Sequence, residues 1–298
     1  MRILIRTSRW AIWARRLGSF ALPLAVIPVV LHRQQVVTTE AFNTMELVAF
    51  IVAALALLAS LVALVRLWIS GDRGWDRAFG GLALALLCLA PFIYGLQLAS
   101  HYPRVSDVAT ENGASLPLVN PLPAQTIAAS RDQVESAFPN AHARSYELDL
   151  DRLYKLVRKQ VADWDWTVLS ENQPGAAGSS AGINAIAPTW LGWRDEVAIR
   201  LSATAGGADI EMRSASLAPS LTDLGANGRR IEDFLLAIDN AVTIEMRDNV
   251  LETPITDDNM PPSNGLSEDS DVVIPAERPP DLRPPPPDPY DTEAPPPD

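Results

Sequence analysis

The residues best suited to bind a ligand form two groups in the second half of the chain. The first group lies in a turn rich in tryptophan and charged residues, and the second lies near the start of a predicted helix. The two groups comprise Trp190, Trp193, Arg194, Asp195, Asp223, Asn227, Arg229 and Arg230. Indole faces beside guanidinium groups and helix N-terminal N–H groups can receive an anionic or planar ligand, or a partner strand. The competing interpretation is structural: the tryptophans close the end of a core, and Asp195 or Asp223 pairs with Arg229 or Arg230.

Catalytic chemistry has little support in the rest of the chain. The stretch Gly178-Ser179-Ser180-Ala181-Gly182 matches the hydrolase pattern G-x-S-x-G, but no histidine follows His142 to act as its base, so we interpret it as a loop. The three histidines and one cysteine lack metal-ligand spacing, and no nucleotide-binding loop occurs, so we predict neither metal nor cofactor. Asp195 and Glu196 would point to opposite faces of a strand, which makes them a poor acid/base pair. We expect no catalytic residue and favour a protein that is not an enzyme.

A small α+β domain over residues 101–249 must position the candidate residues. Apolar residues at helical spacing predict one helix near 150–161 and a second near 224–242. Between them, alternating residues predict strands near 164–169, 197–202 and 210–213, with Gly206-Gly207 as a hairpin turn; a short strand at 143–148 precedes the first helix. This order predicts an antiparallel sheet packed by two helices on one face. On the wet face we expect cross-strand charge pairs among Glu196, Arg200, Glu211 and Arg213.

The same region carries several motifs in a fixed order. They are Tyr102-Pro103-Arg104-Val105-Ser106-Asp107-Val108, Thr189-Trp190-Leu191-Gly192-Trp193-Arg194-Asp195-Glu196-Val197, Arg213-Ser214-Ala215-Ser216, Asp223-Leu224-Gly225 and Asn227-Gly228-Arg229-Arg230-Ile231. Taken together, they resemble the bacterial family known as domain of unknown function 1499, over about residues 101–245. Some members are similar in placing this domain after membrane helices. The resemblance implies a bacterial protein, and it implies no activity.

Three apolar stretches precede the domain, within residues 1–100. Residues 47–65 and 78–96 hold nineteen residues each without a formal charge, enough for a helix to cross the ~30 Å hydrocarbon core of a membrane. Residues 17–31 are fewer and contain Pro23 and Pro28. This first stretch can be a third transmembrane helix, a signal-peptide core or an interfacial segment; because no cleavage site follows it, we favour the uncleaved helix.

The distribution of arginine predicts the orientation of the three helices. Five arginines precede residue 17 and three more lie between residues 66 and 77, whereas the loop at 32–46 carries only Arg33. Basic loops stay in the cytoplasm, so residues 101–298 are expected outside it, which in a bacterium with two membranes is the periplasm. The sequence thus predicts a protein of the bacterial inner (plasma) membrane with an extracytoplasmic domain.

The last part of the chain, residues 250–298, differs from both others. It carries fourteen of the 25 prolines and twelve acidic residues against two basic ones, a composition that favours disorder. Residues 101–249 are also acidic, with thirteen basic against twenty acidic residues, and this excludes a nucleic-acid partner that is held through its phosphates.

Besides a purely structural membrane assembly factor, two functional hypotheses remain open after these observations. The first is a membrane-anchored binding or interaction module, whose partners are the lipid bilayer and an envelope protein or small ligand. The second is an envelope enzyme or lipid-handling factor that uses the turn containing Trp190, Trp193, Arg194 and Asp195.

Overall fold

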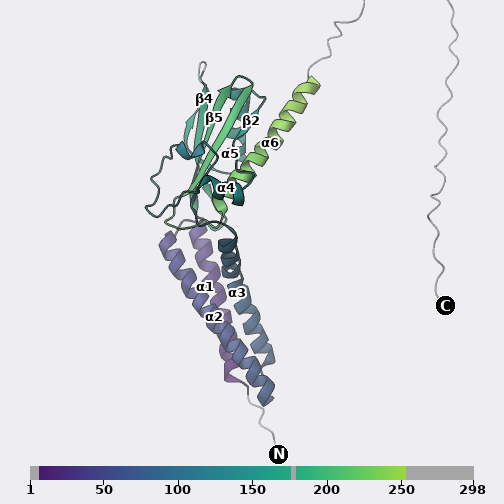
Figure 1. Ribbon diagram of the computed structural model, residues 1–298. Coiled ribbons are helices and arrows are strands. Elements are labelled where there is room, and N and C mark those ends of the chain that lie inside the picture. The colour runs from purple at the N-terminus through teal and green to yellow at the C-terminus, as the bar shows by residue number, and fades with distance from the viewer. Residues whose placement is uncertain (1–6, 176–178, 253–298) are drawn as a thin grey trace, which may run out of the picture. The chain divides into compact units, whose positions relative to one another are not determined.

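Three long helices begin the chain. The computed structural model describes residues 7–175 and 179–252, and it describes side chains as far as residue 247. The helices are α1 (Arg9–Arg33), α2 (Thr39–Ser70) and α3 (Trp75–His101), and each packs against the other two (Figure 1). All three are long and apolar enough to cross a membrane. The prediction of three apolar N-terminal helices is confirmed, and each helix is longer than its apolar stretch.

The first helix is long enough to cross a membrane although its apolar stretch is short. The apolar stretch at 17–31 is the C-terminal part of α1, which has 25 residues and includes Pro23 and Pro28. At 1.5 Å per residue such a helix is about 37 Å long, more than the hydrocarbon thickness. The other two helices are also extended at both ends, so Glu46 lies inside α2, one residue before the charge-free run.

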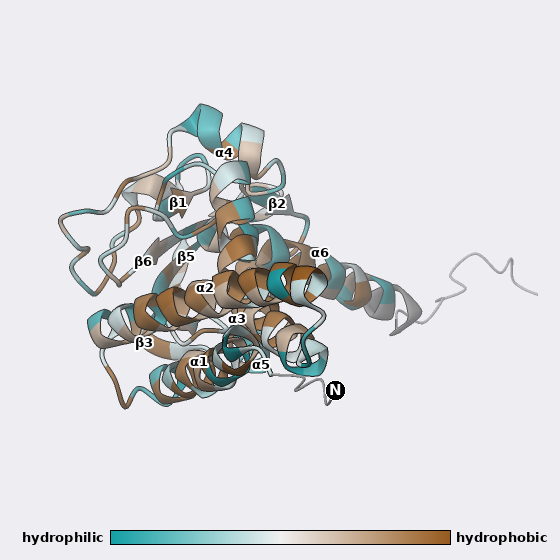
Figure 2. Ribbon diagram, turned by 90° about the horizontal axis from the view of Figure 1, so that it is seen from below, coloured by the Kyte–Doolittle hydropathy of each residue, from teal (hydrophilic) through white to brown (hydrophobic). Residues whose placement is uncertain are grey.

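Small residues mediate the contacts between these helices, and large apolar residues cover their outside. Ala14, Ala53 and Ala85 are fully buried, and a Cβ on Gly81 would lie 2.6 Å from the carbonyl carbon of Ala14. Small residues allow this close approach of helix backbones, as in membrane proteins. Figure 2 shows hydrophobic residues along most of α2, in keeping with a lipid-facing surface.

A six-stranded antiparallel sheet forms the centre of the second half of the chain. Its strands are β1 (Asp107–Ala109), β2 (Arg144–Tyr146), β3 (Thr167–Asn172), β4 (Ser180–Pro188), β5 (Arg194–Thr204) and β6 (Gly207–Ser216). The strand order is β1-β6-β5-β4-β3, and β2 pairs with another part of β6. A tight hairpin joins β5 to β6, with Thr204 opposite Gly207, as the two glycines predicted.

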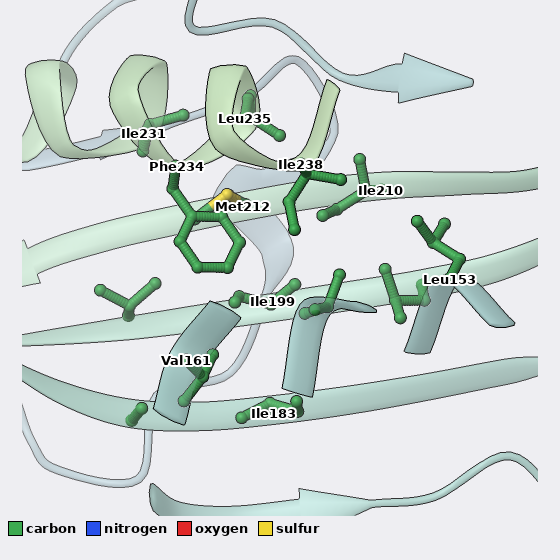
Figure 3. Packing of buried hydrophobic residues seen from close by; sticks show 14 of the residues in the cluster. Leu153, Val161, Ile183, Ile199, Ile210, Met212, Ile231, Phe234, Leu235 and Ile238 are labelled. Atoms are coloured by element: carbon green, nitrogen blue, oxygen red, sulfur yellow. The ribbon is translucent and has the colours of Figure 1, made fainter. Parts of the chain in front are cut away.

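Two helices cover one face of this sheet and enclose the core. They are α5 (Leu150–Asp163) and α6 (Ala226–Glu252), while the short α4 (Arg131–Ala137) lies in the connection before β2. Figure 3 shows Phe234 and Ile238 pointing from α6 toward the strands, with Val161 of α5 on the same side of the sheet. The predicted fold, an antiparallel sheet packed by two helices, is confirmed.

The strand predicted at 164–169 begins later than expected. Trp164 is the C-cap of α5, Asp165 adopts a positive φ of 56°, and β3 starts only at Thr167. Both tryptophans of this segment pack on Phe234, with ring centroids 5.3 and 5.1 Å away, so core packing rather than strand alternation places them.

The sheet face opposite the helices is only partly wet. Arg200 and Glu211 form the predicted cross-strand ion pair. Glu196, expected on the same wet face, is instead fully buried, because the backbone N–H groups of Val119 and Asn120 cover its carboxylate at 2.5 and 2.9 Å. Arg213 pairs with Asp107 of β1 rather than with a neighbour on β5. The disorder predicted for residues 250–298 lies outside the described residues, apart from the end of α6.

Candidate functional site

The turn that joins β4 to β5 is held by its own hydrogen bonds. Thr189 N–H donates to the Trp193 carbonyl at 2.7 Å, and Gly192 N–H donates to the Thr189 carbonyl at 2.9 Å. The Thr189 hydroxyl oxygen also accepts from Trp193 N–H. Gly192 has φ +91°, a conformation that residues with a Cβ rarely adopt. We call residues 189–193 the tryptophan turn.

The tryptophan turn contacts the loop between α1 and α2. His32 Nδ1 lies 2.7 Å from the Leu191 carbonyl oxygen. Because a carbonyl oxygen can only accept, Nδ1 carries the proton and donates this hydrogen bond. Gln35 Nε2 donates to the Gly192 carbonyl at 2.8 Å and to the His32 carbonyl at 2.9 Å. A Cβ on Gly192 would lie 2.8 Å from Arg33 Cα, closer than real side chains come. Glycine is therefore required where the turn meets the loop.

Trp193 adds an aromatic contact to these hydrogen bonds. Its ring meets His32 and Phe42 edge-on, with centroid distances of 6.3 and 6.0 Å, and those two rings stack on each other at 4.5 Å. Such pairs contribute about 0.5–1.5 kcal/mol beyond the area that they bury. Trp193 thus joins the sheet domain to the membrane-type helices and is not free to hold a ligand.

Trp190 and Arg194, in contrast, are open to solvent. Trp190 is 74% exposed, and the Arg33 guanidinium lies 5.9 Å from the centre of its ring. Arg194 begins β5 and lines a cavity of about 300 Å³. Within residues 7–175 and 179–247, no hydrogen bond or ion pair engages its guanidinium group.

The cavity beside Arg194 brings together segments that are distant in sequence. Gln35 comes from the α1–α2 loop and Thr39 from the first turn of α2, and Asn120 comes from the segment that covers Glu196. Ile186 of β4 and Leu217, just after β6, provide apolar walls. We call this space the junction cavity.

Asp195, the residue after Arg194, is enclosed on the other side of β5. Its side chain is 2% exposed and accepts a hydrogen bond from Arg230 Nη2 at 2.6 Å. Arg230 Nη1 donates to Ser214 Oγ at 2.9 Å and to Asn227 Oδ1 at 2.7 Å. One of the pairings that the sequence left open, Asp195 with Arg230, is therefore the one that forms.

Asn227 is the centre of this buried polar network. Its Oδ1 accepts from Ser214 Oγ and from Arg230, and its Nδ2 donates to the Ser106 carbonyl and to Ser216 Oγ. Both donors and both acceptor positions of the amide are thus occupied, as full burial requires. The Ser-x-Ser pattern of β6 follows from this geometry, because Ser214 and Ser216 point to the same face of the strand.

Asp223 and Arg229 stabilise the start of α6. The Asp223 carboxylate accepts from Gly225 N–H at 2.9 Å and Asn227 N–H at 2.7 Å. Burial raises the pKa of Asp223 above its ordinary value, although these two hydrogen bonds oppose the shift. Arg229 donates to the Gly225 carbonyl and lies 5.2 Å from the centre of the Tyr102 ring.

The eight candidate residues therefore divide into two sets. Trp190 and Arg194 are exposed, whereas the other six contact the α1–α2 loop, each other or the start of α6. In the part of the chain that the structure describes, no three His, Cys, Asp or Glu residues are grouped to hold a metal. Gln35 and Thr39 also belong to the site, although the sequence did not single them out. The one feature that marks them in the sequence is that they are polar residues between two apolar stretches.

Comparison with known proteins agrees with the motifs of this domain. Residues 105–238 match the family model described as protein of unknown function (DUF1499), which confirms the resemblance stated from the sequence. No curated protein and no solved structure matches the chain.

Proposed function

We propose that this chain, which places a domain of the DUF1499 family behind three membrane-type helices, is a membrane-anchored binding module of the bacterial inner membrane. Its domain lies on the extracytoplasmic side and binds an envelope protein or a small envelope ligand. The observation that carries the proposal is the tryptophan turn: its inner side joins the helices, while Trp190 and Arg194 stay open beside a cavity.

The two ends of the helix bundle support this orientation. The chain before α1 meets the α2–α3 connection, where Ser8 N–H donates to the Arg73 carbonyl at 3.1 Å. Arg9, Arg66 and Arg77 are near in sequence to the two segments that meet there, whereas Arg33 stands at the opposite end of α1, beside the tryptophan turn. A basic end in the cytoplasm leaves the sheet domain outside it.

The carboxylates near the turn favour binding over turnover. Asp195 is paired with Arg230, Glu196 accepts from backbone and amide groups, and Asp223 accepts from two N–H groups at the start of α6. A general acid or base needs a lone pair or proton that faces substrate. An enzyme that uses Asp195, which follows the turn on β5, is the competing hypothesis, and it would have to open the buried network first.

Paired reporters test the orientation. Two fusion proteins are made, each with its reporter placed directly after Glu252. One reporter works only outside the cytoplasm, and the other works only inside it. We expect activity from the first and none from the second. The reverse result would contradict an extracytoplasmic module.

Photo-crosslinking in living cells tests binding at the exposed side of the turn. A photoreactive amino acid replaces Trp190, and a matched variant carries it at Gly206, where a Cβ would meet open space in the β5–β6 hairpin. We expect envelope lipid or protein adducts at position 190 well above those at position 206. Equal yields at both positions would contradict a binding surface on the turn.

A further inference from the structure

We propose that the junction cavity binds the phosphate group of an anionic membrane lipid, and that Arg194 is the residue that pairs with it. This inference rests on the proposed function, because it names the ligand of the same surface. It is carried by three features of the cavity: its charge, its size and the elements that form it.

The lining of the cavity carries a positive charge. Arg194 is the one charged residue among the described residues that line the cavity, and no acidic side chain lines it. The other polar side chains of the wall are already engaged: Gln35 donates to two carbonyls, Thr39 contacts His32, and Asn120 donates to Glu196. The guanidinium of Arg194 is therefore the group left to pair with a ligand. Its planar donors match two phosphate oxygens, which makes arginine a common phosphate ligand.

The size of the cavity suits a headgroup. Its volume of about 300 Å³ lies at the lower end of the range for small-molecule sites. Ile186 and Leu217 give one apolar wall, against which the glycerol part of a lipid can lie while the phosphate faces Arg194.

The location of the cavity points to a membrane source for the phosphate. Gln35 belongs to the loop between two membrane-type helices and Thr39 begins the second of them, so the cavity lies where those helices leave the membrane. Thr39 precedes the charge-free run, which starts at Leu47, by eight residues, about 12 Å along a helix. Headgroups reach this level above a ~30 Å hydrocarbon core, whereas acyl chains do not. Trp190 and Arg33, stacked nearby, are typical of the membrane–water interface.

The experiment measures lipid retained by the full chain. The protein is purified in detergent, reconstituted in nanodiscs that contain phosphatidylglycerol and phosphatidylcholine, and released for native mass spectrometry. We expect retained phosphatidylglycerol on the wild-type protein. Arg194→Gln should lower the affinity for it roughly tenfold or more, as expected for loss of a charge-assisted hydrogen bond.

Two further variants separate the site from general charge and from misfolding. Arg152→Gln removes the same charge from an exposed position near the start of α5, beside the Asp149 cap. Leu148, just before this helix, lies against Gly207 of the β5–β6 hairpin, which is at the end of β5 opposite Arg194. It should retain phosphatidylglycerol as the wild type does. Ala218→Trp keeps Arg194 but fills the cavity, and it should lose retention as Arg194→Gln does, with unchanged circular dichroism.

Three outcomes would overturn the inference. The first is equal loss in Arg194→Gln and Arg152→Gln, which would indicate unspecific attraction. The second is equal retention of phosphatidylcholine and phosphatidylglycerol by the wild type. The third is binding of soluble glycerol phosphate, measured by calorimetry on the detergent-purified chain, without lipid retention; this would assign the site to a free phosphate compound. In each case, adducts at position 190 above those at position 206 would still support the binding module, so the two proposals fail separately.

Discussion

Arg194 and Asp195 are adjacent in sequence and lie in opposite environments. Arg194 faces the junction cavity with no partner among the described residues, whereas Asp195 is 2% exposed and ion-paired with Arg230. The alternation of side chains along β5 separates them, because successive residues of a strand point to opposite faces. One strand end can therefore carry both a closed structural network and an open binding surface. A variant at either position tests only its own side of the strand.

Among the variants on the two sides of β5, Asp195→Ala should lower the free energy of unfolding the most. This change leaves the Arg230 guanidinium buried without its carboxylate, which typically costs about 3–5 kcal/mol. We expect a correspondingly lower free energy of unfolding in chemical denaturation of the detergent-solubilised chain. The double variant Asp195→Ala with Arg230→Met removes both charges and should regain most of the loss. If the single variant unfolds as the wild type does, Asp195 and Arg230 are not a buried structural pair.

A smaller effect is expected where the tryptophan turn meets the α1–α2 loop. Gly192→Ala places a Cβ at φ +91° and 2.8 Å from Arg33 Cα, so the contact must open at a cost of about 1–3 kcal/mol. Hydrogen exchange should rise at residues 31–36 and 189–193. Gly206→Ala, where a Cβ meets open space, is the matched control and should leave exchange at these residues unchanged. Unaltered exchange in Gly192→Ala would argue against this contact.

The hydrogen bond between Tyr154 and Glu171 should make a smaller contribution to the free energy of unfolding. Tyr154 of α5 donates to Glu171 of β3, and burial together with this hydrogen bond raises the pKa of Tyr154 to about 12, from an ordinary value of 10.0. The protonated form is thus favoured by folding, so its stabilisation is complete below about pH 10 and is lost as the pH rises to about 12. Chemical denaturation across this pH range should show the decline. Tyr154→Phe should have lower stability at neutral pH, by about 1 kcal/mol, and a weaker decline. An identical pH dependence in both proteins would exclude this origin.

The smallest effect is expected on the open side of β5. Arg194→Gln breaks no hydrogen bond or ion pair among the described residues, so the free energy of unfolding should change by no more than about 0.5 kcal/mol. Measured beside Asp195→Ala, this variant is the sharpest test of the comparison. A loss of several kcal/mol would show that Arg194 supports the fold and that its side of the strand is not free for a ligand.

Patterns within short stretches predicted much of this architecture. The helix spacing of Leu150, Leu153 and Val157, the Asp149 cap and the Gly206-Gly207 turn are local signals, and each element formed where expected. The candidate pairing of Asp195 with Arg230 was among the options because both residues could lie at one end of the domain.

Contacts between distant segments could not be predicted from those patterns. The stacking of His32 on Phe42 against Trp193 joins residues about 160 positions apart, and no local pattern encodes it. Glu196 alternates like a solvent-facing strand residue, yet the chain near Asn120 folds over it. The division of the candidate site into exposed and enclosed residues depends on these long-range contacts.

The last strand of the sheet has a consequence for self-association. In the described part of the sheet, β3 pairs only with β4, so its other edge presents unpaired backbone groups to neighbouring molecules. Proteins confined to a membrane meet in two dimensions, where such an edge invites strand-to-strand aggregation. The register shift between Val168 and Ser170 bulges this edge, and Glu171 adds a charge to it. Both features are recognised protections against edge pairing, and they keep neighbouring copies of the protein from joining into extended sheets.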